Sequence, residues 1–194
     1  MKKNTKNMNK ETNVIADSSF YIYFLEETSE PDTLLKIIDR LKFLISEKII
    51  NEITIKNNKF SLIASNKMHI MTIPVDIKEI FAPIMTIKQI QTGEADVIFM
   101  SFHLLRLNKK PIVVLDDKQA RSFLLKNVLP HFTNIDSNEI IYYTLSFLTK
   151  CTKEYRIIDQ DDAIRILNKT RDSGFRASNE QIDTNINKIR NNNI

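Results

Sequence analysis

The sequence predicts an α/β fold, a three-layer α/β/α sandwich with a mainly parallel central sheet and a C-terminal helical extension. Two continuous apolar runs of strand length, residues 13–17 (NVIAD) and 111–115 (PIVVL), each lead directly into an aspartate. Between and after these runs, apolar residues recur at helical spacing. Strands that alternate with helices form a parallel sheet, with right-handed crossovers and helices on both faces.

Composition indicates a globular protein with one core. The chain has 194 residues, of which 42% are hydrophobic and 27% are charged, and its mean hydropathy is -0.25. A chain of this length buries about 70% of its unfolded surface, so it needs no disulfide to fold. No apolar run approaches the roughly 20 residues that cross a bilayer, and the polar N-terminus lacks the apolar stretch of a secretory signal. We therefore expect a cytoplasmic protein without a membrane partner.

Metal sites built on sulfur or histidine do not fit the sequence. Cys151 is the single cysteine, so it cannot form an internal disulfide, and we expect it in the core. The histidines His69, His103 and His131 are scattered and share no ligand spacing. Any bound metal must therefore be held by oxygen ligands.

The net charge of +4 does not identify a substrate. It equals the charge of four lysines near the N-terminus, namely Lys2, Lys3, Lys6 and Lys10. Residues 1–12 are expected to form a disordered basic leader, which could contact phosphate. The remainder of the chain has no net basic character.

The first helices of the chain are predicted from caps and apolar spacing. Ser18 and Ser19 follow the first strand as helix caps, and Pro31 opens a second helix, where its missing N–H costs nothing. The apolar stripe of this second helix packs on the core or forms the surface of a homodimer, and packing on the core is the default. The stripe consists of Leu34, Leu35, Ile38, Leu41 and Phe43.

The middle of the chain predicts a change from helix to strand and back. Ser46 caps a short helix that runs through Glu52. Residues 53–75 are rich in β-branched and alternating residues, so they predict one or two hairpin strands. A helical pattern then returns, broken or kinked near Pro83, and Gly93 precedes a further helix.

The last part of the chain predicts helices. Asp116 and Asp117 follow the second apolar run and can cap the next helix. Gly174 suits the end of a helix, and Ser178 with Gln181 forms a capping box that opens the final one. Beyond the second strand region, the predicted helices cover residues 137–150, 160–172 and 178–190.

Acidic residues are predicted to meet at one edge of the sheet. Asp17 ends the first predicted strand, and Asp116 with Asp117 ends another. Ligands of parallel sheets bind at the carboxyl ends of the strands, where these side chains would lie together. Taken singly, each of them is explained as a helix cap.

Three further acids lie near helix ends. Glu52 ends a helix, whereas Glu94 and Asp96 lie in the first turn of the helix that Gly93 introduces. Acids in a first turn are stabilised by the helix macrodipole, so each residue again has a structural explanation of its own.

Four segments in a constant order make the chain resemble the PIN-domain family. VIADSSFYIYFL, residues 14–25, resembles the strand, aspartate and apolar helix that open a PIN domain. GEADVIFMS, residues 93–101, resembles the Gly-Glu-Ala-Glu/Asp segment of prokaryotic members similar to the toxin ribonucleases of toxin–antitoxin pairs. VVLDDKQARSFL, residues 113–124, and SGFRAS, residues 173–178, resemble the later segments of that subgroup. The resemblance spans residues 13 to about 183.

The resemblance implies a PIN-like domain over residues 13–150, with the helices of residues 151–194 packed on it. It also implies a carboxylate pocket that binds Mg²⁺ or Mn²⁺ and cleaves RNA to leave a 3′-hydroxyl and a 5′-phosphate. The resemblance leaves open whether an antitoxin or another protein partner binds the chain. Matched position by position, the family's four acids correspond to Asp17, Glu52, Asp96 and Asp117, with Glu94 and Asp116 as additional metal ligands.

The chemistry of such a pocket follows from its charges. Carboxylates in one pocket repel, so they take up protons or bind a divalent cation. Hard oxygen ligands favour magnesium or manganese over zinc, and two such ions, about 3.5–4 Å apart, can activate a water for attack on a phosphodiester. Ser18 and Ser19 could orient a ligand or a phosphate.

Arg121 and two tyrosines have more than one interpretation. Arg121 lies one turn beyond Asp117, where it either balances the carboxylates and touches a phosphate or forms a salt bridge within the helix start. Tyr142 and Tyr143 either stack on bases or, as aromatic residues in an apolar stripe more often do, pack in the core.

Two other functions compete with the ribonuclease. The first is the same fold with an incomplete metal site, which would serve as a scaffold that binds RNA or a protein. The second is a phosphoryl-accepting regulatory domain, which also uses aspartates at strand ends. It normally needs an acidic pair after the first strand, where this chain has only Asp17.

Overall fold

The computed structural model describes residues 12–87, 90 and 92–191. The expected basic leader, residues 1–12, therefore lies outside the described residues except for Thr12. None of the helices in these ranges combines the length and the hydropathy that a membrane span requires.

A five-stranded, entirely parallel sheet forms the centre of the fold, in the order β3-β2-β1-β4-β5. Its strands are β1 (Asn13–Ala16), β2 (Lys42–Ile45), β3 (His69–Ile70), β4 (Ile112–Val114) and β5 (Ile141–Tyr142). The α/β class and the parallel sheet are thus confirmed. In this order, β2 and then β3 are added on one side of β1, and β4 and then β5 are added on its other side.

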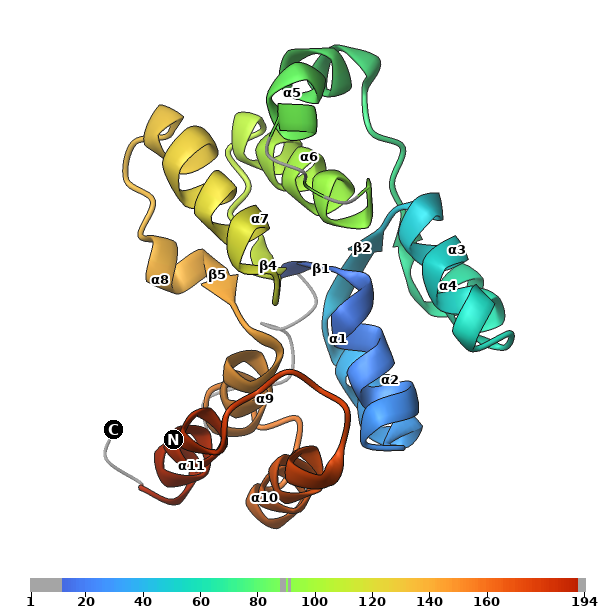
Figure 1. The fold of residues 1–194 in the computed structure, drawn as a ribbon, viewed down its shortest axis with the longest axis vertical. Coiled ribbons are helices and arrows are strands. Elements are labelled where there is room, and N and C mark those ends of the chain that lie inside the picture. The colour runs from blue at the N-terminus through green and yellow to red at the C-terminus, as the bar shows by residue number, and fades with distance from the viewer. Residues whose placement is uncertain (1–11, 88–89, 91, 192–194) are drawn as a thin grey trace, which may run out of the picture.

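Helices cover both faces of this sheet (Figure 1). Figure 1 shows α5, α6 and α7 on one side of the strands, and α1, α2 and the C-terminal helices on the other. In chain order, the helices before β4 are α1 (Ser18–Ile22), the π-helix η2 (Tyr23–Glu27), α2 (Pro31–Arg40), α3 (Glu47–Lys56), α4 (Phe60–Lys67), α5 (Val75–Ile87) and α6 (Thr92–Arg106). Those after β4 are α7 (Lys118–Phe123), η3 (Leu124–Val128), η4 (Leu129–His131), α8 (Ser137–Ile140), α9 (Thr144–Lys153), α10 (Gln160–Lys169), η5 (Thr170–Asp172) and α11 (Asn179–Arg190).

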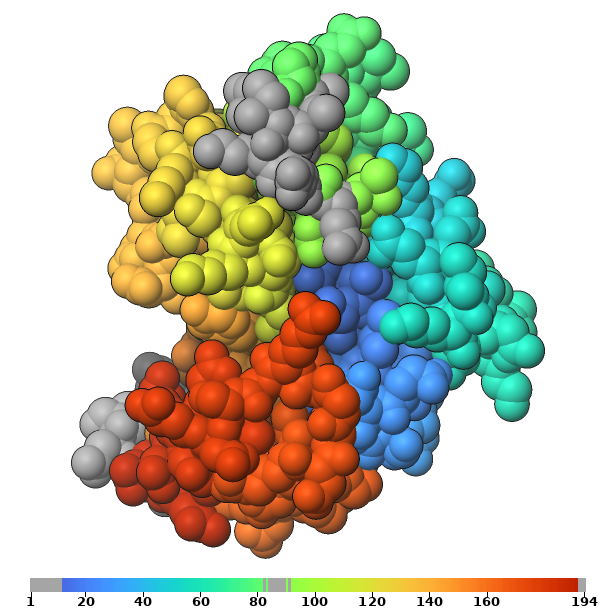
Figure 2. Space-filling view, viewed as in Figure 1, coloured from blue at the N-terminus to red at the C-terminus, as the bar shows by residue number. Residues whose placement is uncertain are grey.

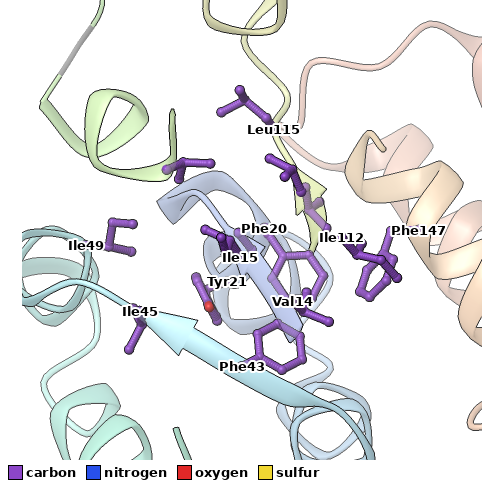
Figure 3. Close-up of a cluster of buried hydrophobic side chains, with 14 of the residues drawn as sticks. Val14, Ile15, Phe20, Tyr21, Phe43, Ile45, Ile49, Ile112, Leu115 and Phe147 are labelled. Carbon is purple, nitrogen blue, oxygen red and sulfur yellow. The ribbon is translucent and has the colours of Figure 1, made fainter. Parts of the chain in front are cut away.

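The core lies between β1 and the helices that follow it (Figure 3). Phe20 of α1 is fully buried, stacks on Phe43 of β2 with ring centroids 5.7 Å apart, and meets Phe147 of α9 edge-on at the same distance. Three elements far apart in sequence therefore meet on one ring. This packing fixes α1, and with it the residue that caps α1, against the sheet.

Strand β2 corrects the predicted extent of the second helix. The stripe was expected to include Leu41 and Phe43, but α2 ends at Arg40 and Phe43 lies in β2, paired in register with Val14 of β1. Leu34, Ile38 and Leu41 are buried, so the stripe packs on the core. Phe43 lies five residues after Ile38 and nine after Leu34, which does not fit helical spacing, so its inclusion in the stripe was wrong.

The predicted hairpin at residues 53–75 is wrong. Helix α3 begins after its cap Ser46 as expected, but it continues past Glu52 to Lys56, and α4 follows it. Ile53 and Phe60 are fully buried, so packing outweighs the preference of β-branched residues for strands. Within residues 53–75, only the short β3 is a strand, and it runs parallel to β2.

The predicted helix at residues 137–150 is divided. Helix α8 ends at Ile140, the two residues of β5 pair in parallel with β4, and α9 begins at Thr144. The predicted capping box of Ser178 and Gln181 is confirmed, since it opens α11 through two reciprocal hydrogen bonds of 2.9 and 3.2 Å. The helix expected from Asp76 on is present as α5, but it runs unbroken through Pro83.

The C-terminal helices are tied to the first helical segment. The Tyr23 hydroxyl lies 2.8 Å from the Thr170 hydroxyl, and the Tyr23 ring meets the Phe175 ring edge-on at 4.8 Å. Helix α9 itself crosses the expected boundary at residue 150. Residues after 150 thus pack directly on the elements that follow β1.

Two buried tyrosines in the same segment are expected to respond differently to removal of their hydroxyls. The Tyr21 hydroxyl is buried without a hydrogen-bond partner among the described residues, whereas the Tyr23 hydroxyl is bonded to Thr170. Tyr21→Phe should leave the free energy of unfolding unchanged or raise it, and Tyr23→Phe should lower it by about 1 kcal/mol. Urea denaturation of both variants measures this difference. Equal losses in the two variants would show that the Tyr21 hydroxyl is bonded in solution.

Candidate active site

The candidate site lies where the direction of strand addition reverses. Strands β1 and β4 are neighbours, with Ala16 opposite Val114, and the Asp17 amide donates to the Val114 carbonyl at 3.1 Å. The connections from β1 and from β4 lead away in opposite directions, which opens a crevice at the carboxyl ends of these two strands. Asp17 follows β1 and Asp116 follows β4 beyond Leu115, so both reach this crevice.

Asp17 is held by backbone donors from both sides of the crevice. It is 2% exposed and caps α1, since the amide of Phe20 donates to its Oδ1 at 3.2 Å. The amide of Asp116 donates to its Oδ2 at 3.3 Å. One carboxylate therefore joins the start of α1 to the end of β4, and its position is fixed by the backbone.

Asp116 is held by a residue that the sequence did not indicate. The Thr144 amide donates to Oδ1 of Asp116 at 3.0 Å, and the Thr144 hydroxyl donates to Oδ2 at 2.5 Å. Thr144 is fully buried at the start of α9, directly after β5. Because β5 pairs with β4, this threonine arrives beside a residue 28 positions earlier, which no local pattern could predict.

Burial perturbs both carboxylates, and the charge of Asp116 also acts on Asp17. Burial raises the pKa of Asp17 well above its ordinary value, and the negative charges of Asp116 and Glu94 raise it further against the opposing effect of its two amide donors. Burial also raises the pKa of Asp116, although the bonds from Thr144 and the charge of Arg121 lower it. An arrangement of this kind favours a bound proton or a bound cation.

Asp117 and Arg121 have separate roles in this geometry. Asp117 caps α7, with the Ala120 amide donating to Oδ1 at 2.7 Å. The guanidinium of Arg121 donates to the carbonyls of Leu115 and Asp116 at 2.8 and 2.6 Å. Across the described part of the chain, Arg121 makes no salt bridge, so the alternative of an ion pair at the helix start is not formed. The charge of Arg121 instead lowers the pKa of Asp116.

Glu52 lies against the first turn of α6. A methyl group added at Gly93 would come within 2.5 Å of Oε2 of Glu52, so the glycine is what allows this carboxylate to approach. Glu94 lines the pocket described below, and its negative charge raises the pKa of Asp17. Asp96 is 3% exposed. It follows Glu94 by two residues in α6, and side chains two residues apart in a helix point to roughly opposite sides. Asp96 is not among the residues that line the pocket.

A pocket of about 690 Å³ is bordered by three of the predicted acids, Glu94, Asp116 and Asp117, whereas Asp17, Glu52 and Asp96 are not among its lining residues. It is lined by Ser18, Ser19, Ile22, Glu27, Lys56, Glu94, Asp116, Asp117, Lys118, Gly174, Phe175 and Arg176. Figure 2 shows the orange-red segment that follows α10 reaching the surface between the blue of α1 and the yellow of α7. The site thus combines five separate parts of the chain, including the SGFRAS segment.

Gly174 brings that C-terminal segment close to the first helix. Its amide donates to Oε2 of Glu27 at 2.7 Å, and an added Cβ would lie 3.1 Å from the same oxygen. Gly174 does not have a positive φ, so it does not end the preceding helix in the left-handed conformation that the sequence suggested. Close approach to Glu27 is the physical reason for glycine here.

Three cations line the pocket together with the acids. Lys56, Lys118 and Arg176 make no hydrogen bond or ion pair through their side chains within residues 12–87, 90 and 92–191. Cations without a protein partner beside a carboxylate pair are suited to a ligand that carries phosphate. None of the three was predicted, because isolated basic residues occur throughout the sequence.

The oxygen ligands match the chemistry of magnesium or manganese. No three acidic, histidine or cysteine side chains in the described ranges converge closely enough to share one ion. Mg²⁺ is, however, usually held by only one or two carboxylates, with waters and substrate phosphates as its other ligands. The pair Asp17 and Asp116, with Glu94 near it, supplies that number of carboxylates.

The chain was compared with protein families, with curated proteins and with solved structures. No family model, no curated protein and no solved structure matches it. The functional inference therefore depends on the crevice between β1 and β4, its paired aspartates and its unpaired cations.

Proposed function

We propose that this protein is a metal-dependent ribonuclease of the PIN type, which hydrolyses phosphodiester bonds of RNA with bound Mg²⁺ or Mn²⁺. The observation that carries the proposal is the pair Asp17 and Asp116, held by backbone donors and Thr144 at the reversal point of a parallel sheet. Raised pKa values in both carboxylates are typical of a site that is completed by a cation. The resemblance of four sequence segments to PIN-domain ribonucleases agrees with this function.

Each group of residues has a task in the proposed reaction. Asp17 and Asp116, with Glu94 beside them, would hold the metal. The bound metal supplies charge neutralisation, a more acidic water and stabilisation of the leaving oxygen. The hydroxyls of Ser18 and Ser19 orient the scissile phosphate at the start of α1. The three cations that line the pocket, Lys56, Lys118 and Arg176, attract and position the phosphates.

The remaining predicted acids have supporting tasks in the same proposal. Asp117 lines the pocket while it caps α7, so one of its oxygens is committed to the Ala120 amide. Glu52 and Asp96 are assigned to the site from the resemblance. Glu52 is close to the first turn of α6, which also carries Glu94.

An antitoxin or other protein partner, a homodimer and a cytoplasmic location belong to the same proposal. Cys151, which is buried as a free thiol, suits a reducing compartment.

The rival functions are separated by chemistry. A phosphoryl-accepting domain needs an aspartate that a phosphate donor can reach. It also normally has an acidic pair after the first strand, where this chain has only Asp17. An RNA-binding scaffold without catalysis needs only the cations, and it is distinguished by the assay below.

Cleavage of labelled RNA tests the proposal. Wild-type protein with Mn²⁺ or Mg²⁺ is expected to cut single-stranded or structured RNA, and EDTA should abolish the activity. Asp17→Asn should lower the rate by at least about a hundredfold, since it weakens a ligand of the proposed metal. Asp161→Asn, an exposed acid of α10, should cleave like the wild type. Equal cleavage by the Asp17 variant would exclude a nuclease at this site, and RNA retention without cleavage would favour the scaffold.

A further inference from the structure

A second pocket adjoins the carboxylate pocket. It also has a volume of about 690 Å³, and it shares Asp116, Phe175 and Arg176 with the first. From these shared residues it extends along α9 and α11 as far as Tyr143 and Lys188. A ligand in the first pocket could therefore continue into the second without leaving the surface. The volume lies within the range of sites for small ligands.

Tyr143 and Arg121 form an ordered flat surface in this second pocket. The guanidinium carbon of Arg121 lies 3.8 Å from the centre of the Tyr143 ring, and Arg121 is fixed by its bonds to two backbone carbonyls. The Tyr143 amide donates to the Ser146 hydroxyl at 2.9 Å, which fixes the backbone that carries the ring. Little side-chain freedom remains to be lost when a ligand stacks there.

The exposure of Tyr143 is not explained by packing. The side chain is 46% exposed, although the sequence favoured a place in the core. Its neighbour Tyr142 is only partly exposed and packs near Phe147, with ring centroids 6.3 Å apart. Arg121 covers one face of the Tyr143 ring, and Tyr143 nevertheless keeps 46% of its surface exposed. A partly exposed aromatic ring beside cations is typical of proteins that stack on unpaired bases.

We propose that the second pocket is a nucleotide subsite, in which a base of single-stranded RNA stacks on Tyr143 while its phosphate contacts Arg176. This inference rests on the proposed ribonuclease function, since it places the nucleotide next to the cleaved bond. Tyr143 and Thr144 are consecutive, and Thr144 holds both oxygens of Asp116. The stacked base would thus be fixed relative to the carboxylates by a single peptide unit.

The charges of the pocket agree with a nucleotide. Arg176 and Lys188 both line the pocket, and within the described ranges neither side chain makes an ion pair. Two phosphates that flank one base could be bound there. Glu180 also lines the pocket and can accept a hydrogen bond from an exocyclic amino group of the base. A base inside a duplex has no free face, so the subsite selects unpaired RNA.

RNA binding in EDTA tests the subsite without cleavage. Fluorescence anisotropy would measure the affinity of the full chain for a labelled single-stranded RNA and for the same strand in a duplex. Tyr143→Ala should weaken binding of the single strand by about tenfold, as expected for the loss of one stacked base. It should leave duplex binding unchanged. Tyr143→Phe keeps the ring and should bind like the wild type. Tyr143→Leu gives a second variant without an aromatic ring, should the alanine variant be unstable.

The outcomes separate the subsite from the nuclease. Single-stranded binding that is unchanged in folded Tyr143→Ala or Tyr143→Leu, or an equal loss with single strand and duplex, overturns the subsite. If the wild type cleaves with Mn²⁺ while the alanine variant binds and cleaves equally well, the subsite fails and the nuclease stands. If the alanine variant loses binding to the single strand but the wild type never cleaves, the subsite stands and the nuclease fails. No binding of single-stranded RNA by the wild type overturns the subsite.

Discussion

Asp116→Asn is expected to raise the stability of the metal-free protein and to lower metal-dependent cleavage by at least about a hundredfold. The asparagine oxygen can accept the Thr144 amide as Oδ1 does now, and its amide group can donate to the Thr144 hydroxyl. The hydrogen bonds are thus retained, while the negative charge that raises the pKa of Asp17 is removed. We expect a gain of about 1 kcal/mol in the free energy of unfolding in EDTA.

The gain should depend on pH in a defined direction. An acid with a raised pKa in the folded state favours folding when it is protonated, and this stability is lost as pH rises from the unfolded pKa through the folded pKa. The difference between Asp116→Asn and the wild type should therefore vanish in acid, below the ordinary value of 3.8, and grow toward neutral pH. Urea denaturation in EDTA at several pH values measures it.

Two further measurements make this expectation specific. Added Mn²⁺ should stabilise the wild type more than the Asp116 variant, because a metal that binds only the folded state stabilises it. Asp117→Asn is a matched control for stability, since asparagine caps helices as well as aspartate does. Lower stability of Asp116→Asn than of the wild type in EDTA at neutral pH, or equal stabilisation of both by Mn²⁺, would contradict the paired-carboxylate site.

The sequence predicted the part of the site that depends on single strands. The apolar runs before Asp17 and near Asp116 are continuous because β1 and β4 are buried on both faces, and this makes them recognisable without a structure. Once two parallel strands are recognised, their carboxyl ends must lie at the same edge. The convergence of Asp17 and Asp116 follows from that rule alone.

The parts that failed depend on contacts between distant segments. Strands β3 and β5 have two residues each, so they have no periodicity to detect, and their pairing with β2 and β4 defines them. Residues 53–75 have strand-forming composition but fold mainly as helices, because Ile53 and Phe60 are buried there. Thr144 reaches the site only because β5 precedes it.

The order of importance among the acids also changed with three-dimensional information. Sequence matching ranked Asp117 above Asp116 and Asp96 above Glu94. In the fold, Asp116 is the residue bonded beside Asp17, and Glu94 is the acid of α6 that lines the pocket. Asp116 and Asp117 both line the pocket, whereas Asp96 does not, and a sequence motif records neither differences in hydrogen bonding nor position in the pocket. Cleavage by Glu94→Gln and by Asp96→Asn would rank this second pair.

Glu30→Gln is expected to lower the free energy of unfolding by about 2 kcal/mol at neutral pH, the second large effect in this chain. The side chain of Glu30 is only 11% exposed, and it accepts hydrogen bonds from Arg165 and Lys169 of α10, the latter at 2.5 Å. These bonds join α10 to the turn before α2. A neutral glutamine leaves Lys169 without a carboxylate partner in this group and Arg165 with Asp162 alone.

The loss should disappear in acid. The hydrogen bond from Arg165 is the main cause that lowers the pKa of Glu30, and burial opposes it. A group whose pKa is lowered by folding stabilises the fold above its unfolded pKa, near 4.5, and this stability is lost as pH falls through the folded value. Wild type and Glu30→Gln should therefore differ at pH 7 and converge well below 4.5. Urea denaturation at both pH values measures this.

Asp162→Asn separates this buried pairing from surface charge. Asp162 also pairs with Arg165, at 3.1 Å, but its side chain is 39% exposed, so its removal should cost less than about 0.5 kcal/mol. Equal losses from the two variants would mean that Glu30 acts only as a surface charge.

The pairing of Glu30 also matters for the site, because α10 leads into the segment that bears Gly174 and Arg176. In the proposed ribonuclease, a looser α10 in Glu30→Gln should therefore raise the KM for RNA more than it lowers kcat, since Arg176 is proposed to contact substrate while the carboxylates are held by β1, β4 and Thr144.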